Sequence, residues 1–146
     1  MPLNGTGVEP RDGGGSYTIV LTFDSPVDGG TATVTNGTGT AGAPSFNGND
    51  MIVSVTGVTD QQVITLSVSN VHGTNGATQP SASIDLGFLV GDTNSDREVN
   101  VGDTIQVRSH AGVVDGTTFQ YDLNLDGQID VGDTTMVRSR SGDFIP

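Results

Sequence analysis

An acidic stretch of twelve residues that occurs twice, with an offset of 30 residues, constrains the fold more than any other feature of this chain. The two copies read DTNSDREVNVGD at residues 92–103 and DLNLDGQIDVGD at residues 122–133. The similarity continues beyond them, because Val-Arg-Ser recurs at residues 107–109 and 137–139. A repeat of this length predicts two copies of one supersecondary unit.

Both stretches place oxygen-bearing side chains at positions 1, 3, 5, 7, 9 and 12, through which a twelve-residue loop wraps Ca²⁺. Position 7 ligates through its backbone carbonyl, and position 9 often through water. The predicted ligands, for two calcium ions in total, are Asp92, Asn94, Asp96, Glu98, Asn100 and Asp103 in the first loop, and Asp122, Asn124, Asp126, Gln128, Asp130 and Asp133 in the second.

Positions 6 and 8 of the loops carry further information. Position 6 requires a sharp turn that favours glycine, which is present as Gly127 but replaced by Arg97 in the first loop. A non-glycine residue with positive φ costs about 1–2 kcal/mol, so the first site is expected to be the weaker one. Position 8 holds Val99 and Ile129, apolar residues that are expected to pair the two loops.

The alternative to a metal site is a pair of acidic surface turns, since Asp and Asn also favour turns. Two complete sets of coordinating positions in register favour the site, and the net charge of −12 suits cations. A short helix is predicted after each loop, with Asp103 and Asp133 as its caps and Gly112 and Gly142 at its end.

The residues before the repeat have a different pattern. Apolar and polar residues alternate with period two, as in half-buried strands, and Asn-Gly turns separate the segments. The predicted strands are residues 16–24, 31–35, 51–58, 61–71 and 83–90. The pattern predicts a mainly β fold, with an immunoglobulin-like β-sandwich at residues 16–90 followed by a small α unit at residues 91–146.

Residues 1–15 form a predicted N-terminal extension. A run near residues 6–11 is expected to add an edge strand, because Pro10 cannot donate to a central ladder. Five or six strands are one or two fewer than the seven of an immunoglobulin-like sandwich, which predicts an exposed groove. The extension is therefore expected to complete its own sheet or a neighbour's, with Leu3 and Val8 filling the groove.

Composition excludes several classes of function. The chain has no cysteine, hence no disulfide or thiolate chemistry. Its negative charge argues against nucleic acids and anionic membranes as partners, and no apolar stretch of membrane-spanning length occurs. The first residues lack the apolar segment of a signal peptide, so a mature form or a C-terminal portion is expected. No catalytic motif surrounds His72 or His110, and the chain is not expected to be an enzyme.

The tandem loop–helix units at residues 91–146 resemble type I dockerins, whose duplicated segments read Asp-x-Asn-x-Asp-Gly-x-(Ile/Val)-(Asn/Asp)-x-x-Asp. Each unit is a half EF-hand, a loop with its exiting helix. The chain is also similar to C-terminal modules of large secreted proteins of environmental bacteria, which implies an extracellular or cell-surface location. The resemblance implies a cohesin-like partner. At loop positions 10 and 11, where cohesin-binding dockerins often have Ser-Thr, this chain has Val-Gly.

Three non-catalytic functions remain open from the sequence. The first is a calcium-stabilised structural protein that assembles head-to-tail into a filament or surface layer. The second is an adaptor that anchors a parent protein to a cohesin-like receptor. The third is a carbohydrate-binding module, although the chain has no tryptophan for stacking on sugars. Arg108 and Arg138, at equivalent helix positions, either face a partner or complement the acidic loops.

Overall fold

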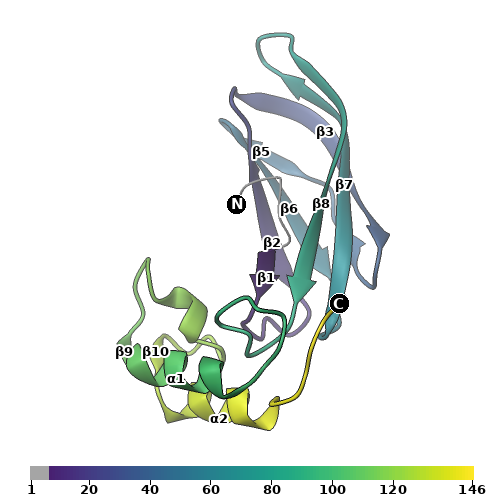
Figure 1. Ribbon diagram of the computed structural model, residues 1–146. Helices are drawn as coiled ribbons and strands as arrows, with labels where there is room; N and C mark the ends of the chain where they lie inside the picture. The colour runs from purple at the N-terminus through teal and green to yellow at the C-terminus, as the bar shows by residue number, and fades with distance from the viewer. Residues whose placement is uncertain (1–6) are drawn as a thin grey trace. The chain divides into compact units, whose positions relative to one another are not determined.

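The computed structural model describes residues 7–146, which form a mainly β structure with two α-helices in that range (Figure 1). The chain divides into two compact units. The first, here called the β unit, contains Gly15–Thr59 and Ile64–Leu86. The second, here called the loop–helix unit, contains Gly7–Gly14, Asp60–Val63 and Gly87–Pro146, so the boundary predicted between residues 90 and 91 falls inside it.

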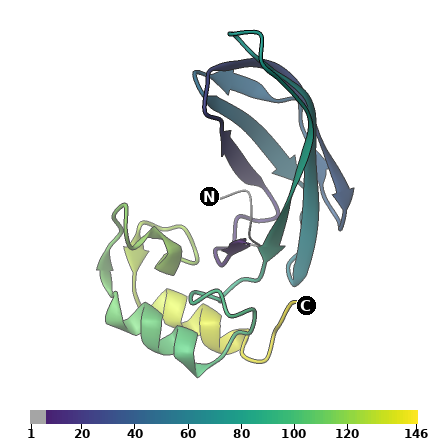
Figure 2. The ribbon, with the colours of Figure 1, turned by 45° about the horizontal axis from the view of Figure 1, so that its top comes forward.

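Eight strands precede the first helix in the described residues, and they form two sheets. The strands are β1 (Gly7–Glu9), β2 (Tyr17–Thr22), β3 (Val27–Asn36), β4 (Thr40–Ala41), β5 (Ser45–Asn47), β6 (Asp50–Thr56), β7 (Gln62–Gly73) and β8 (Thr78–Phe88). One sheet has the order β1-β8-β7-β3, and the other has the order β2-β6-β4 with β5 also paired to β6. Both views show the strands of the β unit in two layers (Figures 1 and 2).

The predicted alternation of buried and exposed side chains is confirmed in the β unit. Strands β2 and β6 pair antiparallel, with Tyr17 opposite Val55 and Leu21 opposite Met51. The buried apolar side chains of the sheets are Leu21, Val27, Met51, Val53, Val55, Ile64, Leu66, Val68, Val71, Ile84, Leu86 and Phe88. Period-two burial follows because successive side chains of a strand point to opposite faces of its sheet.

The expected shortage of strands is wrong. Strands β4 and β5, of two and three residues, lie in a stretch that the sequence pattern assigns to turns. Segments this short contain too few residues to display an alternation, and pairing with β6 defines them instead. The exposed groove was predicted only because one or two strands were expected to be missing, and the described residues contain those strands.

The predicted edge strand near residues 6–11 is confirmed as β1, which lies beside β8 of the same chain at the edge of its sheet. The residue that follows β1 is Pro10, which is buried. Of the two residues expected to fill a groove, Val8 packs against the core of the loop–helix unit, whereas Leu3 lies outside the described residues.

The loop–helix unit contains two equivalent helices, α1 (Val101–Ser109) and α2 (Val131–Ser139). Between them lie β9 (Gly112–Val113), the 3₁₀ helix η1 (Phe119–Tyr121) and β10 (Gln128–Ile129). The core of the loop–helix unit consists of Leu89, Val99, Val107, Tyr121, Leu123, Ile129, Val137 and Ile145. Neither helix is long or apolar enough, within residues 7–146, to cross a lipid bilayer.

The helix caps differ from the prediction. The N-caps are Asn100 and Asp130, whose side chains accept hydrogen bonds from the backbone N–H of Gly102 and Gly132. Asp103 and Asp133 occupy the third helical position and close a capping box by accepting from the N-cap N–H. The helices end at Ser109 and Ser139, three residues before the predicted glycines.

Candidate metal centre

Position 12 is the anchor of each loop. Asp133 Oδ1 accepts from the backbone N–H groups of Leu123 at 2.8 Å and Asn124 at 3.3 Å. Its Oδ2 accepts from the N–H of Asp130 at 2.8 Å. Asp103 accepts the equivalent three bonds in the first loop, from the N–H groups of Thr93, Asn94 and Asn100, at 2.9, 3.2 and 2.9 Å. Both side chains are fully buried, so each carboxylate joins the start of its loop to the helix that follows.

Position 1 lies next to this anchor in both loops. The Asp92 carboxylate accepts from the N–H of Asp96 at 3.2 Å and of Arg97 at 2.9 Å. The Asp122 carboxylate accepts from Asp126 and Gly127 in the same way, at 3.1 and 3.0 Å. Burial of Asp92 raises the pKa of its carboxyl group, and the nearby carboxylates of Asp103 and Asp96 act in the same direction. A cation at this point would favour the ionised form.

Positions 3 and 5 form the exposed part of each loop. Asn94 Oδ1 accepts from the N–H of Asp96, and its amide nitrogen donates to the Asp96 carboxylate at 2.8 Å. Asn124 and Asp126 repeat both bonds at 3.0 and 2.8 Å. Because these oxygens lie on the solvent side while Asp92 and Asp122 lie beneath them, the two loops have the same arrangement of donors for an ion.

The backbone at position 6 has the predicted conformation in both loops. The φ angle is +73° at Arg97 and +87° at Gly127. The arginine therefore adopts the left-handed turn that favours glycine, as the ligand pattern requires. Its guanidinium group extends to the carbonyl oxygen of Pro146, at 2.7 Å.

Position 8 is buried as predicted, but the two loops do not pair with each other. Val99 exchanges backbone hydrogen bonds of 2.9 Å with the segment after α2, through the N–H of Gly142 and the carbonyl of Asp143. Ile129 pairs with Gly112, in the segment after α1. Each loop is thus completed by the exit segment of the other repeat.

The remaining predicted ligands have other roles in the structure. At position 7 the side chains of Glu98 and Gln128 are exposed, and only their backbone carbonyls remain as candidate ligands. At position 9 the side-chain oxygens of Asn100 and Asp130 accept from the helix N-terminus. Their predicted part in coordination is therefore the least supported of the set.

The chemistry of the donors fits calcium, which prefers carboxylate, amide and carbonyl oxygens. Three or more acidic or histidine side chains do not converge on one point anywhere in residues 7–146. In an arrangement of this type, asparagine and backbone oxygens complete the shell, and only three acidic side chains of the first loop, Asp92, Asp96 and Asp103, are candidate ligands. The loops therefore contain oxygen atoms of the kind that calcium prefers, and in this structure those oxygens accept hydrogen bonds from backbone N–H groups.

Comparison with known proteins does not assign the chain to a family. No family model matches it, and no curated protein or solved structure matches it either.

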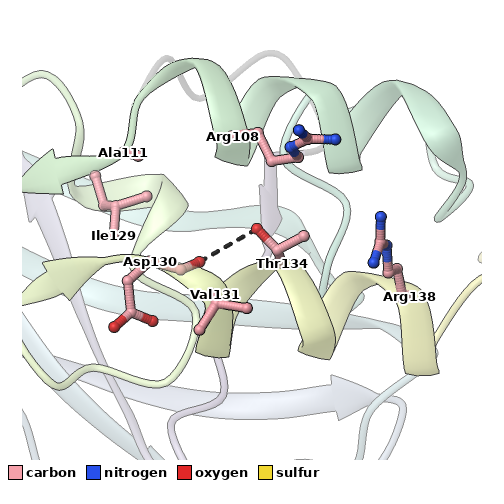
Figure 3. Close-up of a pocket in the computed structure, with 7 residues that line it drawn as sticks. All are labelled: Arg108, Ala111, Ile129, Asp130, Val131, Thr134 and Arg138. Carbon is pink, nitrogen blue, oxygen red and sulfur yellow. Dashed lines mark hydrogen bonds between the residues drawn. The ribbon is translucent and has the colours of Figure 1, made fainter.

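The two helices also share a face that carries two arginines. A pocket of about 490 Å³ is lined by Arg108, Ala111, Ile129, Asp130, Val131, Thr134 and Arg138 (Figure 3). In Figure 3 the side chain of Arg138 extends from α2 toward α1, and that of Arg108 lies along α1. Neither forms an ion pair or hydrogen bond with any residue of the described range 7–146.

Three residues that support the loops were missed by the sequence analysis. Asp60 accepts a hydrogen bond from the N–H of Val90 at 2.9 Å and forms an ion pair with Arg140. Arg140 also lies 4.0 Å from the carboxylate of Asp12. These residues come from three distant segments of the chain, and no local pattern in the sequence marks them as neighbours.

Proposed function

We propose that this chain is a non-catalytic, calcium-stabilised structural protein that acts outside the cell. In this proposal the β unit is an immunoglobulin-like sandwich, and the loop–helix unit is a dockerin-like pair of half EF-hands that holds two calcium ions. The observation that carries it is the duplicated network around Asp92 and Asp103 and around Asp122 and Asp133. Two loops with the same buried carboxylates and the same left-handed turn favour a site over surface turns.

The loops have a physical reason to need a cation. Asp92, Asp103 and Asp133 are fully buried, and Asp122 nearly so, in a chain with a net charge of −12. Burying a carboxylate without a counter-charge is costly even when hydrogen bonds reach it. A divalent ion that binds the folded form alone would stabilise it by about 2.7 kcal/mol at a concentration of one hundred times its Kd.

Calorimetric titration of the metal-free protein with calcium tests this proposal. We expect two bound ions per chain, with the second loop filled first. Asp92→Asn together with Asp122→Asn should abolish binding, while Asp24→Asn together with Asp28→Asn, both at exposed positions, serves as a control of equal charge change. A full chain that binds no calcium, or binds it equally after both loop substitutions, would refute the proposal.

Self-association through the helix face is the second part of the proposal. All five cationic side chains of the protein are arginines, and Arg108 and Arg138 are the two without a partner among residues 7–146. Exposed apolar side chains lie on the same helices, with Val101 70%, Ile105 61% and Val131 76% exposed. A second copy, with its strongly acidic surface, complements such a face.

A cohesin-like receptor is the alternative partner for the same face, and a carbohydrate ligand is a further alternative with less support. Light scattering after size-exclusion chromatography in calcium distinguishes self-association from binding to a different protein. We expect oligomers that dissociate when both Arg108 and Arg138 are changed to Gln. The pair Thr78→Glu and Ser83→Glu, at two exposed positions of β8, alters the net charge equally and should leave the oligomers intact. A monomer in calcium would favour the receptor.

A further inference from the structure

The segment Gly7–Gly14, here called the strap, belongs to the loop–helix unit although it lies far before the first loop in the sequence. It carries no predicted calcium ligand. Its first residues form β1, and its backbone continues beside Leu89 and Gly91, whose N–H groups donate to the carbonyls of Glu9 at 3.3 Å and Pro10 at 2.9 Å.

The strap is bonded to both loops next to their first ligand. Gly91, which donates to Pro10, directly precedes Asp92 and has a φ of +101°. In the second loop, the N–H of Asp12 donates to the carbonyl of Leu123 at 2.8 Å. Leu123 directly follows Asp122, and its own N–H donates to the position 12 carboxylate of Asp133. The strap thus holds a peptide adjacent to position 1 in each loop.

Side chains fix the strap in this position. Arg11 forms a two-bond ion pair with Glu9, at 2.6 and 2.8 Å, and its guanidinium carbon lies 5.1 Å from the centre of the Phe119 ring. Arg140, at the end of α2, approaches Asp12. The chain of contacts therefore extends from the strap to the helix of the second repeat.

From these contacts we infer that the strap is a positioning element shared by the two calcium loops, and that strap docking and calcium binding are coupled. The inference rests on the proposed calcium function. A peptide held next to position 1 limits the movement of that ligand, as partners behind metal ligands generally do. Coupling is reciprocal: if the docked strap raises calcium affinity, calcium must favour the docked strap by the same factor.

Hydrogen exchange in the intact protein tests the coupling without altering the chain. We expect calcium to slow exchange of the Asp12 amide by about tenfold or more, in step with the loop amides. Exchange at Asp12 that stays constant while the loop amides become protected would overturn the inference and leave the proposed function standing. A full chain that binds no calcium would overturn both.

Truncation provides the second test. Removal of residues 1–12 should lower calcium affinity at both loops by about tenfold or more, although no ligand is lost. Removal of residues 1–6 alone is the matched control and should leave both affinities unchanged. A synthetic peptide of residues 7–14, added to the longer truncation, should restore part of the affinity. Equal affinities in the full chain and the longer truncation would refute the inference.

Discussion

Arg97 and Gly127 occupy the same position in the two loops and have nearly the same backbone conformation, with φ angles of +73° and +87°. The preceding carboxylates, Asp92 and Asp122, accept from the N–H of these residues at 2.9 and 3.0 Å. The turn is therefore a requirement of the loop and not a consequence of glycine. An arginine can adopt it only with strain of about 1–2 kcal/mol.

Replacing Arg97 with Gly should therefore raise calcium affinity at the first site, by about threefold to tenfold. The loss of the exposed hydrogen bond to Pro146 reduces the gain, since such a bond contributes only about 0.5–1.5 kcal/mol. Calorimetry with calcium measures the change. The reverse test is Gly127→Ala, which introduces strain in the second loop and should weaken that site. Unchanged affinity in both variants would contradict the prediction.

Calcium removal should unfold the loop–helix unit and leave the β unit largely folded. The loop carboxylates repel one another without the metal, and a unit of this size has little apolar core to oppose them. Limited proteolysis with and without EGTA, followed by mass spectrometry, locates the cuts. We expect cuts within residues 91–146 in EGTA. Equal protease resistance in both conditions would show that metal contributes nothing to this part of the chain.

The two loops also predict unequal effects of equal substitutions. Asp126→Ala and Asp96→Ala remove the same position 5 carboxylate from loops with the same hydrogen bonds. Because the second loop has no strained residue at position 6, it is expected to be the stronger site. Asp126→Ala should thus cause the larger loss of thermal stability in calcium. A larger loss for Asp96→Ala would reverse the order of the sites.

Asp133→Ala should destabilise the unit by more than the loss of one loop carboxylate does. The substitution leaves the backbone N–H groups of Leu123, Asn124 and Asp130 without their acceptor. The Leu123 N–H is buried, and an unsatisfied buried donor costs about 1–3 kcal/mol. We expect a loss of about 2–4 kcal/mol in the free energy of unfolding. Denaturant unfolding in calcium, with Asp126→Ala as the control that also loses a loop carboxylate, measures it. Equal losses for the two variants would argue against the anchoring role.

The turn before η1 provides a pH test outside the loops. A side-chain hydrogen bond from Thr117, with further bonds from Thr117 N–H and Thr118, lowers the pKa of Asp115 below its ordinary value of 3.8. An acid with a lowered pKa stabilises the fold above 3.8, and this contribution is lost as the pH falls through the lowered pKa. NMR titration of the Asp115 carboxyl carbon should therefore have its midpoint below 3.8. A midpoint at or above 3.8 contradicts the hydrogen-bonded turn.

Much of the loop–helix unit follows from short stretches of sequence. The spacing of Asp92, Asp96 and Asp103 within twelve residues specifies a loop whose side chains turn back on its own backbone, and the structure contains those hydrogen bonds. The burial of Val99 and Ile129 and the positive φ of Arg97 follow from the same pattern. The alternation in β2 and β6 likewise predicts their buried faces, because a period of two is a local property of a strand.

Contacts between distant segments depend on the tertiary structure. Strands β4 and β5 are too short to have a pattern of their own, and they exist because β6 supplies their hydrogen-bonding partners. The pairing of Val99 with the segment after α2, the ion pair between Asp60 and Arg140, and the bond from Asp12 to Leu123 join residues that share no local spacing. Sequence by itself determined which oxygens are available to a metal and where each loop turns, since both depend on a dozen consecutive residues. Only the packing of the chain decided which segments support those loops, because that choice depends on which buried backbone groups are left for another segment to satisfy.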